Sequence, residues 1–395
     1  MKNQNTIKSA GGIVVRRNGK RFKVLLLYKN GEWLLPKGRI ERESEKKAAF
    51  REIYEECGIP IKKMKIIGKL GKVHYVARQP EDNYQPRNKI VSYFLFQTDF
   101  SKIIPLAKEG FTDAGWFDLE TAFKKLTYFE SKDILLRAIN KLVKPRKIKT
   151  AVVAIGGEGV RVGKKYNPKL LLKINGRPFF YFVLALLLAQ FEKVYLLTGF
   201  YHQQLTSFVK KTFPRLINNR IYFIDGGIEG NAKALYQVKN LIKEPFLYMD
   251  GNVICSTEIL KKLINFHHAA ITLLVSPTSL INTHLHIKTK NGKIIDMIPV
   301  VSKHRCVKKL LCSLGIMVID YRLFELIPDF SKFNDLDLVI DFVFRNRPEI
   351  DIKPVIYKGA WYCIHTKSDI ESVNGKGRQL FCSLTKTPTA SLSRR

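Results

Sequence analysis

The sequence has few of the features that mark a secreted or membrane-bound protein. Its six cysteines include no Cys-x-x-Cys pair and no regular spacing, which is typical of reduced thiols rather than of a disulfide or zinc framework. No apolar run reaches the roughly 18 residues that a membrane-spanning helix needs, and the first residues lack the apolar stretch of a secretory signal. We therefore expect a cytoplasmic protein with no membrane partner.

Acidic residues are also scarce. The 34 aspartates and glutamates stand against 68 lysines and arginines, which gives a net charge of +34. Such an excess attracts phosphorylated ligands in general. The excess is similar in the first 145 residues and in the remainder, so no segment stands out as a face for nucleic acid. We expect a nucleotide-sized ligand and no nucleic-acid partner.

The 395 residues are enough for two domains. In the first part, segments rich in Val, Ile, Tyr and Phe predict strands, and segments with helical spacing predict helices. The predicted strands are 11–15, 22–28, 65–76 and 89–98, and the predicted helices are 44–57, 120–126 and 131–143. This pattern predicts an α/β/α sandwich over residues 1–142.

A charged segment that contains a proline, residues 143–149, predicts a linker. From there on strands alternate with helices, with strands predicted at 150–155, 193–199 and 245–250 and a helix at 179–191. The alternation predicts a doubly wound, parallel α/β sheet of the Rossmann-like kind over 150–375. Residues 376–395 are rich in Ser, Thr and basic residues, so we expect a disordered tail.

Three glutamates on the first predicted helix are the most informative feature of the chain. Glu55 and Glu56 follow Glu52 by three and four residues, so all three point to one face of the helix. A hard divalent cation such as Mg²⁺ would relieve their repulsion and keep water and phosphate oxygens as its other ligands. The alternative is an ordinary acidic surface helix. Ser44 is expected as the N-cap, and Gly58 just past the end.

The segment from residue 38 to residue 59 resembles the Nudix box. The matching residues are Gly38, Glu43, Arg51, Glu52, Ile53, Glu55, Glu56, Gly58 and Ile59. The flanking sequences SAGGIVV and WLLPKG are also similar to the family. The departure is one residue missing between the glycine and the first glutamate. That deletion shortens the loop before the helix but leaves the spacing of the later glutamates intact.

The resemblance implies a pyrophosphohydrolase in which Mg²⁺ or Mn²⁺ assists the attack of water on a nucleoside diphosphate joined to another group. The residues that it implies for metal binding and catalysis are Glu52, Glu55, Glu56, Gly38 and Arg51, the last as the residue that orients the carboxylates. Glu109, in a later loop, is a candidate general base. Residues 113–138 look like the end of diadenosine polyphosphate hydrolases, so we favour a dinucleoside polyphosphate or nucleotide substrate.

Several further side chains near this segment are candidates for substrate contacts. Lys37 and Arg39 flank the glycine of the box and could meet phosphate, although solvated loop charges are equally common. Tyr75, Tyr84 and Tyr93 could stack on a base, although strand aromatics more often fill the core.

In the second domain, a glycine-rich turn at 156–161 follows the first predicted strand. The turn, the PKLL segment at 168–171 and the later motifs LLTGF, GNAKAL, PFLYMDGN and SLGIMVID resemble the sugar-phosphate nucleotidyltransferases. The resemblance implies binding of a nucleotide or sugar phosphate through backbone amides and basic side chains. The residues that it implies are Gly157, Gly159, Arg161, Lys169 and Asp250.

Two aspartates that hold Mg²⁺ in that family are missing here. Asn252 and Cys363 stand at their positions, and neither an amide nor a thiol suits a hard cation. Lys233 also replaces a glycine that lets the base approach. We therefore expect a degenerate transferase that retains binding. The pairs Cys363/His365, His267/His268 and His284/His286 are not expected to bind metal, because none has an evident partner pair.

Three interpretations of the whole chain follow. The leading one is a Nudix hydrolase with a second domain that binds a related ligand. The second is a bifunctional enzyme in which Asp250 supports an active nucleotidyltransferase. The third is a non-catalytic protein that binds nucleotides or nucleic acid. The retention of all three box glutamates favours the first over the third.

Overall fold

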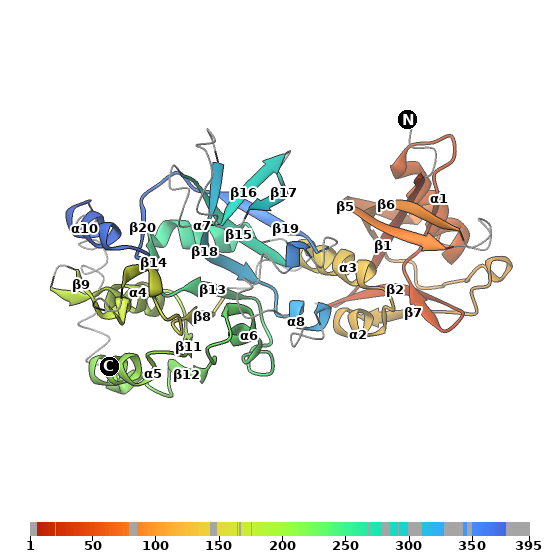
Figure 1. Ribbon diagram of the computed structural model, residues 1–395. Helices are drawn as coiled ribbons and strands as arrows, with labels where there is room; N and C mark the ends of the chain where they lie inside the picture. Colours follow the sequence, from red (N-terminus) through yellow and green to blue (C-terminus); the bar gives the residue numbers. More distant parts are fainter. Residues whose placement is uncertain are drawn as a thin grey trace. The chain divides into compact units, whose positions relative to one another are not determined.

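A computed structural model of the chain describes residues 6–19, 21–78, 85–142, 148–163, 165, 167–174, 176–267, 269–278, 285–290, 292–298, 310–327, 343–345 and 350–376. Residues 143–147 of the expected linker, the expected tail from 377 onward, and Tyr84, His268 and His284 lie outside this part. The chain divides into two compact units, Met1–Lys144 and Pro145–Arg395. Figure 1 shows the elements of each unit.

A mixed seven-stranded sheet forms the centre of the first unit. Its strands are β1 (Thr6–Asn18), β2 (Arg21–Lys29), β3 (Glu32–Leu34), β4 (Lys37–Arg39), β5 (Met64–Arg78), β6 (Pro86–Thr98) and β7 (Asp113–Asp118). The order is β3-β2-β1-β6-β5, with β4 beside β1 and β7 beside β2. The β1–β6 pair is parallel, and β1–β2, β2–β3, β1–β4, β2–β7 and β5–β6 are antiparallel. The four predicted strands fall within β1, β2, β5 and β6.

Helices pack against this sheet because its strands are apolar on both faces. The helices are α1 (Glu45–Cys57), α2 (Leu119–Lys125) and α3 (Phe129–Leu142), with short 3-10 turns η1 (Ile61–Lys63) and η3 (Ala107–Glu109). Val14 of β1 packs in one core with Ile53 of α1. Ile13 and Val15 are also fully buried, and strand alternation turns them to the other face, where α3 contacts β1 and β5. The α/β sandwich prediction is confirmed.

The second unit is built on a nine-stranded sheet. Its strands are β8 (Thr150–Ala154), β11 (Lys193–Thr198), β12 (Ile221–Asp225), β13 (Phe246–Asp250), β15 (Ile271–Thr278), β16 (His286–Lys290), β17 (Lys293–Ile298), β18 (Leu310–Ile319) and β19 (Ile352–Ile356). The main order is β12-β11-β8-β13-β18-β15-β19. The small pairs β9 (Lys173–Ile174) with β10 (Arg177–Pro178) and β14 (Val253–Cys255) with β20 (Trp361–Cys363) lie outside it.

The expected parallel sheet is present in part. Strands β12, β11, β8 and β13 run parallel, but β18 runs antiparallel to both β13 and β15. A parallel pair needs a long crossover, whereas consecutive strands can pair antiparallel through short turns. The strands from β15 to β18 include such antiparallel pairs, since β16 pairs antiparallel with both β17 and β18.

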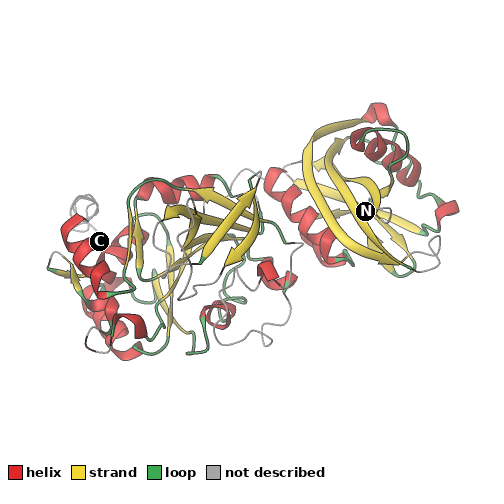
Figure 2. Ribbon diagram, turned by 45° about the horizontal axis from the view of Figure 1, so that its top comes forward, coloured by secondary structure: helices red, strands yellow, loops and turns green. Residues whose placement is uncertain are grey.

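The second unit also contains helices, drawn in red in Figure 2. They are α4 (Phe179–Leu188), α5 (His202–Thr212), α6 (Asn231–Tyr236), α7 (Thr257–Asn265), α8 (Leu323–Leu326) and α10 (Lys367–Lys376), with 3-10 turns η4 (Val160–Val162), η6 (Lys169–Leu171) and η7 (Pro214–Leu216). All ten residues of α4 are buried, which explains its uninterrupted apolar sequence. Among the described residues, no helix is long and apolar enough to cross a membrane.

The strand order of the second unit reverses between β8 and β13, and the edge at which these two strands end is here called the crevice. Chain order runs from β8 outward through β11 to β12, and then returns to β13 on the other side of β8. At such a reversal the loops that leave the two central strands diverge, and ligands bind outside the carboxyl ends of those strands. The loops here are the glycine-rich turn after Ala154 and the segment that follows Asp250.

Candidate functional site

Local sequence signals fix the ends of α1. The Ser44 hydroxyl accepts a hydrogen bond from the Lys47 amide at 3.3 Å, and Gly58 adopts φ 69° while its N–H donates to the Tyr54 carbonyl. These are the N-cap and C-cap that the sequence predicts. The caps set the phase of the helix and therefore the direction of its glutamates.

Two of the three box glutamates are buried. Glu52 is 6% exposed and Glu56 is 4% exposed, whereas the side chain of Glu55 is 41% exposed. Burial raises the pKa of Glu52, and burial raises the pKa of Glu56 to about 8 although Lys37 opposes the shift. Two buried carboxylates side by side are unfavourable unless a positive group compensates them.

The loop before α1 approaches these carboxylates with its backbone. The Lys37 amide donates to Glu56 Oε2 at 2.8 Å. A Cβ on Gly38 would collide with the Glu52 carboxylate, so any other residue here would have to displace Glu52. The glycine of the box therefore allows close approach of the loop to the acidic face.

Arg51 joins several carboxylates of the box. Its guanidinium lies 2.7 Å from Glu43, 2.8 Å from Glu52 and 2.8 Å from Glu55, and it also donates to the Arg39 carbonyl at 2.9 Å. In the described residues, no three His, Cys, Asp or Glu side chains form a group that could hold a metal ion. The geometry gives the reason, because the guanidinium lies between Glu52 and Glu55.

Glu109 reaches the same site from a distant loop. The loop is fixed to the end of α1 by two backbone hydrogen bonds, from Ile104 to the Cys57 carbonyl at 3.0 Å and from Leu106 to the Glu56 carbonyl at 3.2 Å. The charge of Glu109 is a further influence that raises the pKa of both Glu52 and Glu56. The charge of Glu109 is thus felt by both buried carboxylates of the box.

The aromatic candidates are placed less favourably. Tyr93 is 2% exposed and belongs to the core, so it offers no open ring face to a base. Tyr75, on β5, is partly buried, and burial raises the pKa of its hydroxyl. Of the two, Tyr75 is the remaining candidate for a stacking contact.

Three glycines form the floor of the crevice in the second unit. A Cβ on Gly199 would lie 2.7 Å from the carbonyl oxygens of both Gly156 and Gly227. These glycines follow β8, β11 and β12, so three strand ends meet by backbone contact alone. Gly157 faces open space, and Gly159 adopts φ 74°. The predicted turn therefore has room for a ligand beside Gly157.

Asp250 is not placed as a metal ligand. Its Oδ1 accepts hydrogen bonds from the Tyr248 hydroxyl at 3.1 Å and the Asn231 amide at 3.3 Å. A Cβ on Gly315 would collide with its Oδ2, so the carboxylate lies against that backbone. Burial raises the pKa of Asp250 to about 6. These contacts hold the side chain in the protein interior.

The remaining candidates of the second unit have structural partners. Lys233 forms an ion pair with Glu229 at 3.1 Å. His267 bonds Thr272 at 2.9 Å, and His286 lies opposite Cys312 in the sheet. Cys363 is buried, which raises the pKa of its thiol. The four described cysteines, Cys57, Cys255, Cys312 and Cys363, are buried, as expected of small core residues.

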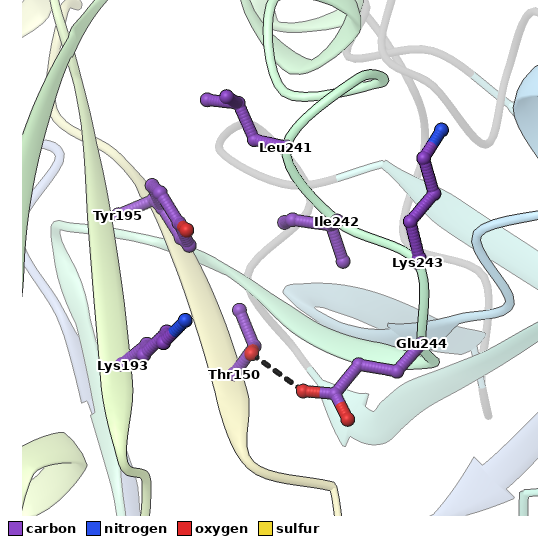
Figure 3. Close-up of a pocket in the computed structure, with 7 residues that line it drawn as sticks. All are labelled: Thr150, Lys193, Tyr195, Leu241, Ile242, Lys243 and Glu244. Atoms are coloured by element: carbon purple, nitrogen blue, oxygen red, sulfur yellow. Dashed lines mark hydrogen bonds between the residues drawn. The ribbon is translucent and has the colours of Figure 1, made fainter.

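A separate hollow of about 270 Å³ lies at the opposite end of the strands (Figure 3). Thr150 and Lys193, the first residues of β8 and β11, line it together with Lys243 and Glu244. The Thr150 hydroxyl donates to Glu244 at 2.8 Å. Because parallel strands have their carboxyl ends at one edge, this hollow is remote from the glycine floor.

Comparison with known proteins agrees with this division into two units. Residues 6–138 match the family model of the NUDIX domain. An Ap4A hydrolase of C. elegans aligns with 33% of the chain and 92% of its own, at 27% identity and a TM-score of 0.29. The match to the family model shows that the first unit contains a NUDIX domain.

The second unit has the nucleotidyltransferase fold. An inositol-1-phosphate CTP transferase of T. maritima aligns with 61% of this chain and 98% of its own, with a TM-score of 0.50 and 16% identity. The bifunctional protein GlmU of Methanococcus maripaludis is 22% identical over 230 residues, 57% of this chain. The chain spans 54% of the length of that relative. These similarities establish the fold.

Proposed function

We propose that the first unit hydrolyses a nucleoside diphosphate joined to a second group, with dinucleoside polyphosphates and nucleotides as the favoured substrates. The observation that carries this proposal is the pair of buried carboxylates, Glu52 and Glu56, which lie against the backbone of Lys37 and Gly38. The likeness of residues 113–138 to diadenosine polyphosphate hydrolases supports the choice of substrate.

A divalent cation, Mg²⁺ or Mn²⁺, would bind this acidic face once the Arg51 guanidinium no longer lies between Glu52 and Glu55. Glu52, Glu55 and Glu56 offer hard oxygen ligands. Burial raises the pKa of Glu52 and Glu56, and a cation beside them would offset this cost of burying two carboxylates. When bound, the cation would neutralise the phosphates and lower the pKa of its water.

The chain's own side chains have distinct tasks in this scheme. Arg51 holds Glu43, Glu52 and Glu55 in position through its planar guanidinium. Glu109, on the loop that bonds the end of α1, is the proposed acceptor for the proton of the attacking water. The oxygen of that water bonds to phosphorus while the bridging oxygen leaves with the other phosphate.

The test is Mg²⁺-dependent phosphate release from dinucleoside polyphosphates, nucleoside triphosphates and nucleotide sugars. We expect turnover with at least one class and a loss of a hundredfold or more in Glu55→Gln and Glu56→Gln, since these glutamines keep shape but lose charge. Glu45→Gln is the matched control, because Glu45 lies on the same helix but bonds Lys69 and Lys72 instead. Absence of turnover on every substrate would contradict the proposed substrate class.

For the second unit we propose binding of a nucleotide or sugar phosphate at Gly157, Gly159, Arg161 and Lys169. The open space beside Gly157, at the switch point of the sheet, supports this. The contacts of Asp250 argue against the bifunctional alternative, because its Oδ1 accepts two hydrogen bonds within the protein and its Oδ2 lies against the Gly315 backbone. Formation of a nucleotide sugar from a sugar 1-phosphate and a nucleoside triphosphate would restore that alternative.

A further inference from the structure

His365 lies at the mouth of the crevice in the second unit and connects its two sides. Its Nδ1 is 3.2 Å from an Arg161 guanidinium nitrogen and 3.3 Å from the Asn252 amide nitrogen. Arg161 follows β8, Asn252 follows β13, and His365 follows β20. Residues that are far apart in the sequence therefore meet in one small cluster.

The donors of this cluster fix the state of the histidine. Arginine has no acceptor atom, and the Asn252 amide nitrogen is oriented by a second bond to the Ile364 carbonyl at 3.2 Å. Nδ1 of His365 must therefore accept, and the imidazole carries its proton on Nε2. The cluster directs N–H groups toward an electron-rich atom, which is the arrangement that an anion requires.

Lys169 adds a second positive charge close to Arg161. Burial is the main reason why the pKa of the Lys169 ammonium is lowered, and the neighbouring Arg161 charge is the next. Two like charges held together gain from a phosphate placed between them. Lys169 begins the η6 turn, and Arg161 belongs to the η4 turn. Both residues therefore come from the segment that follows β8.

The nearby carboxylates are committed to other partners. Asp250 accepts from Tyr248 and Asn231. Asp369 Oδ2 accepts from the backbone amides of His365 and Thr366, both at 2.8 Å, and so caps the start of α10. Arg161, Lys169, Asn252 and His365 form a cluster that is rich in donors. Asp250 and Asp369 are the two carboxylates whose charges act on Lys169 in the described part of the chain, and both already accept hydrogen bonds within the protein.

We infer that the second unit binds the phosphate of its ligand without a divalent cation, and that Arg161, Lys169, Asn252 and His365 supply the compensating charge and hydrogen bonds. This inference rests on the proposed binding function of the unit and specifies how the ligand is held. The ligand class is a phosphate monoester or diphosphate whose oxygens take the place of His365 Nδ1 as the acceptor for Arg161.

The experiment is a calorimetric titration of the full-length chain with inorganic pyrophosphate, once with excess EDTA and once with Mg²⁺. The Glu56→Gln background suppresses hydrolysis by the first unit. Arg161→Ala and Lys169→Ala test the site, and the unfolding temperature of each variant shows whether it is folded. Lys193→Ala is the control, because Lys193 is a lysine at the opposite end of the same sheet.

We expect binding in EDTA that is at least as tight as in Mg²⁺. Arg161→Ala should weaken it about tenfold or more, as expected when a charge-assisted hydrogen bond is lost, and Lys193→Ala should leave it unchanged. Binding that needs Mg²⁺ would overturn this inference but keep the proposed binding function. No binding under either condition would overturn both. Binding in EDTA that survives Arg161→Ala and Lys169→Ala would place the anion elsewhere and also overturn the inference.

Discussion

Gly38 lies so close to Glu52 that a Cβ at residue 38 would collide with the Glu52 carboxylate. The loop before α1 and the acidic face of the helix are therefore in direct contact through backbone. A side chain at residue 38 must therefore displace the Glu52 carboxylate, which is 6% exposed.

We predict that Gly38→Ala destabilises the first unit by about 1–3 kcal/mol, the usual range for an overpacked site, and lowers hydrolysis at least tenfold. Thermal unfolding and phosphate release measure the two effects. Gly157→Ala is the stability control, because a Cβ there meets nothing within 4 Å; it should change stability by less than about 0.5 kcal/mol. Equal stability of Gly38→Ala and wild type would show that the loop can move away.

Arg51→Lys should lower activity about 10- to 100-fold, the range for residues that orient metal ligands. Lysine keeps the charge but cannot bond Glu43, Glu55 and the Arg39 carbonyl at once. Phosphate release at saturating Mg²⁺ measures the effect. Arg16→Lys, at an arginine that lies over Trp116, is the control and should retain activity. Full activity of Arg51→Lys would mean that charge alone is required.

Glu45 should make the first unit sensitive to acid. Hydrogen bonds from Lys69 and Lys72 lower the pKa of Glu45 to about 2. The unfolded chain takes up this proton first as pH falls, so the stabilisation is complete above about pH 4.5 and is lost between there and pH 2. Glu45→Gln should be less stable at pH 7 by about 0.5–1 kcal/mol, since the groups are partly exposed.

The measurement for Glu45 is urea unfolding at several pH values. The difference between wild type and Glu45→Gln should shrink as pH falls toward 2. Glu120→Gln is the control, because Glu120 is 72% exposed and pairs only with Lys124 across one helical turn in the ion pairs of the described residues. A difference for Glu45→Gln that does not depend on pH would contradict the assigned ion pairs.

Asp250 should make the second unit less stable as pH rises, which is the opposite of the effect of Glu45 in the first unit. Its pKa is raised from 3.8 to about 6 by burial, so the folded state holds the proton when the unfolded state has lost it. Stability should therefore be greatest below about pH 4 and fall as pH rises to 6, by up to about 1.4 kcal/mol per pH unit. Asp250→Asn should remove this slope, as measured by unfolding of the second unit. A slope unchanged in the variant would assign it to another group.

The ends of α1 and the main strands were predictable because their signals are local. Ser44 and Gly58 cap the helix through atoms three or four residues away, and the runs of β-branched and other apolar residues in β1 and β2 need no knowledge of the rest of the chain. The burial of Glu52 and Glu56 was not predictable, because it depends on loops that fold back over the helix.

Contacts across long sequence separations explain the other differences. His365 meets Arg161 across 204 residues, and no spacing rule links them. From the sequence, His365 was considered only as a weak candidate for metal binding. In the structure its Nδ1 accepts from two N–H groups, those of Arg161 and Asn252. Likewise, the antiparallel direction of β18 follows from its pairing with β13 and β15, which the alternation of earlier elements does not reveal.

The glycine floor of the second unit has a consequence for how this crevice can change during evolution. A Cβ on Gly199 would lie 2.7 Å from the carbonyl oxygens of Gly156 and Gly227, and Gly227 has φ 67°, a backbone conformation that favours glycine. Side chains should therefore be poorly tolerated at Gly199 and Gly227. In related sequences we expect these two glycines to stay constant while side chains such as Arg161 and His365 vary.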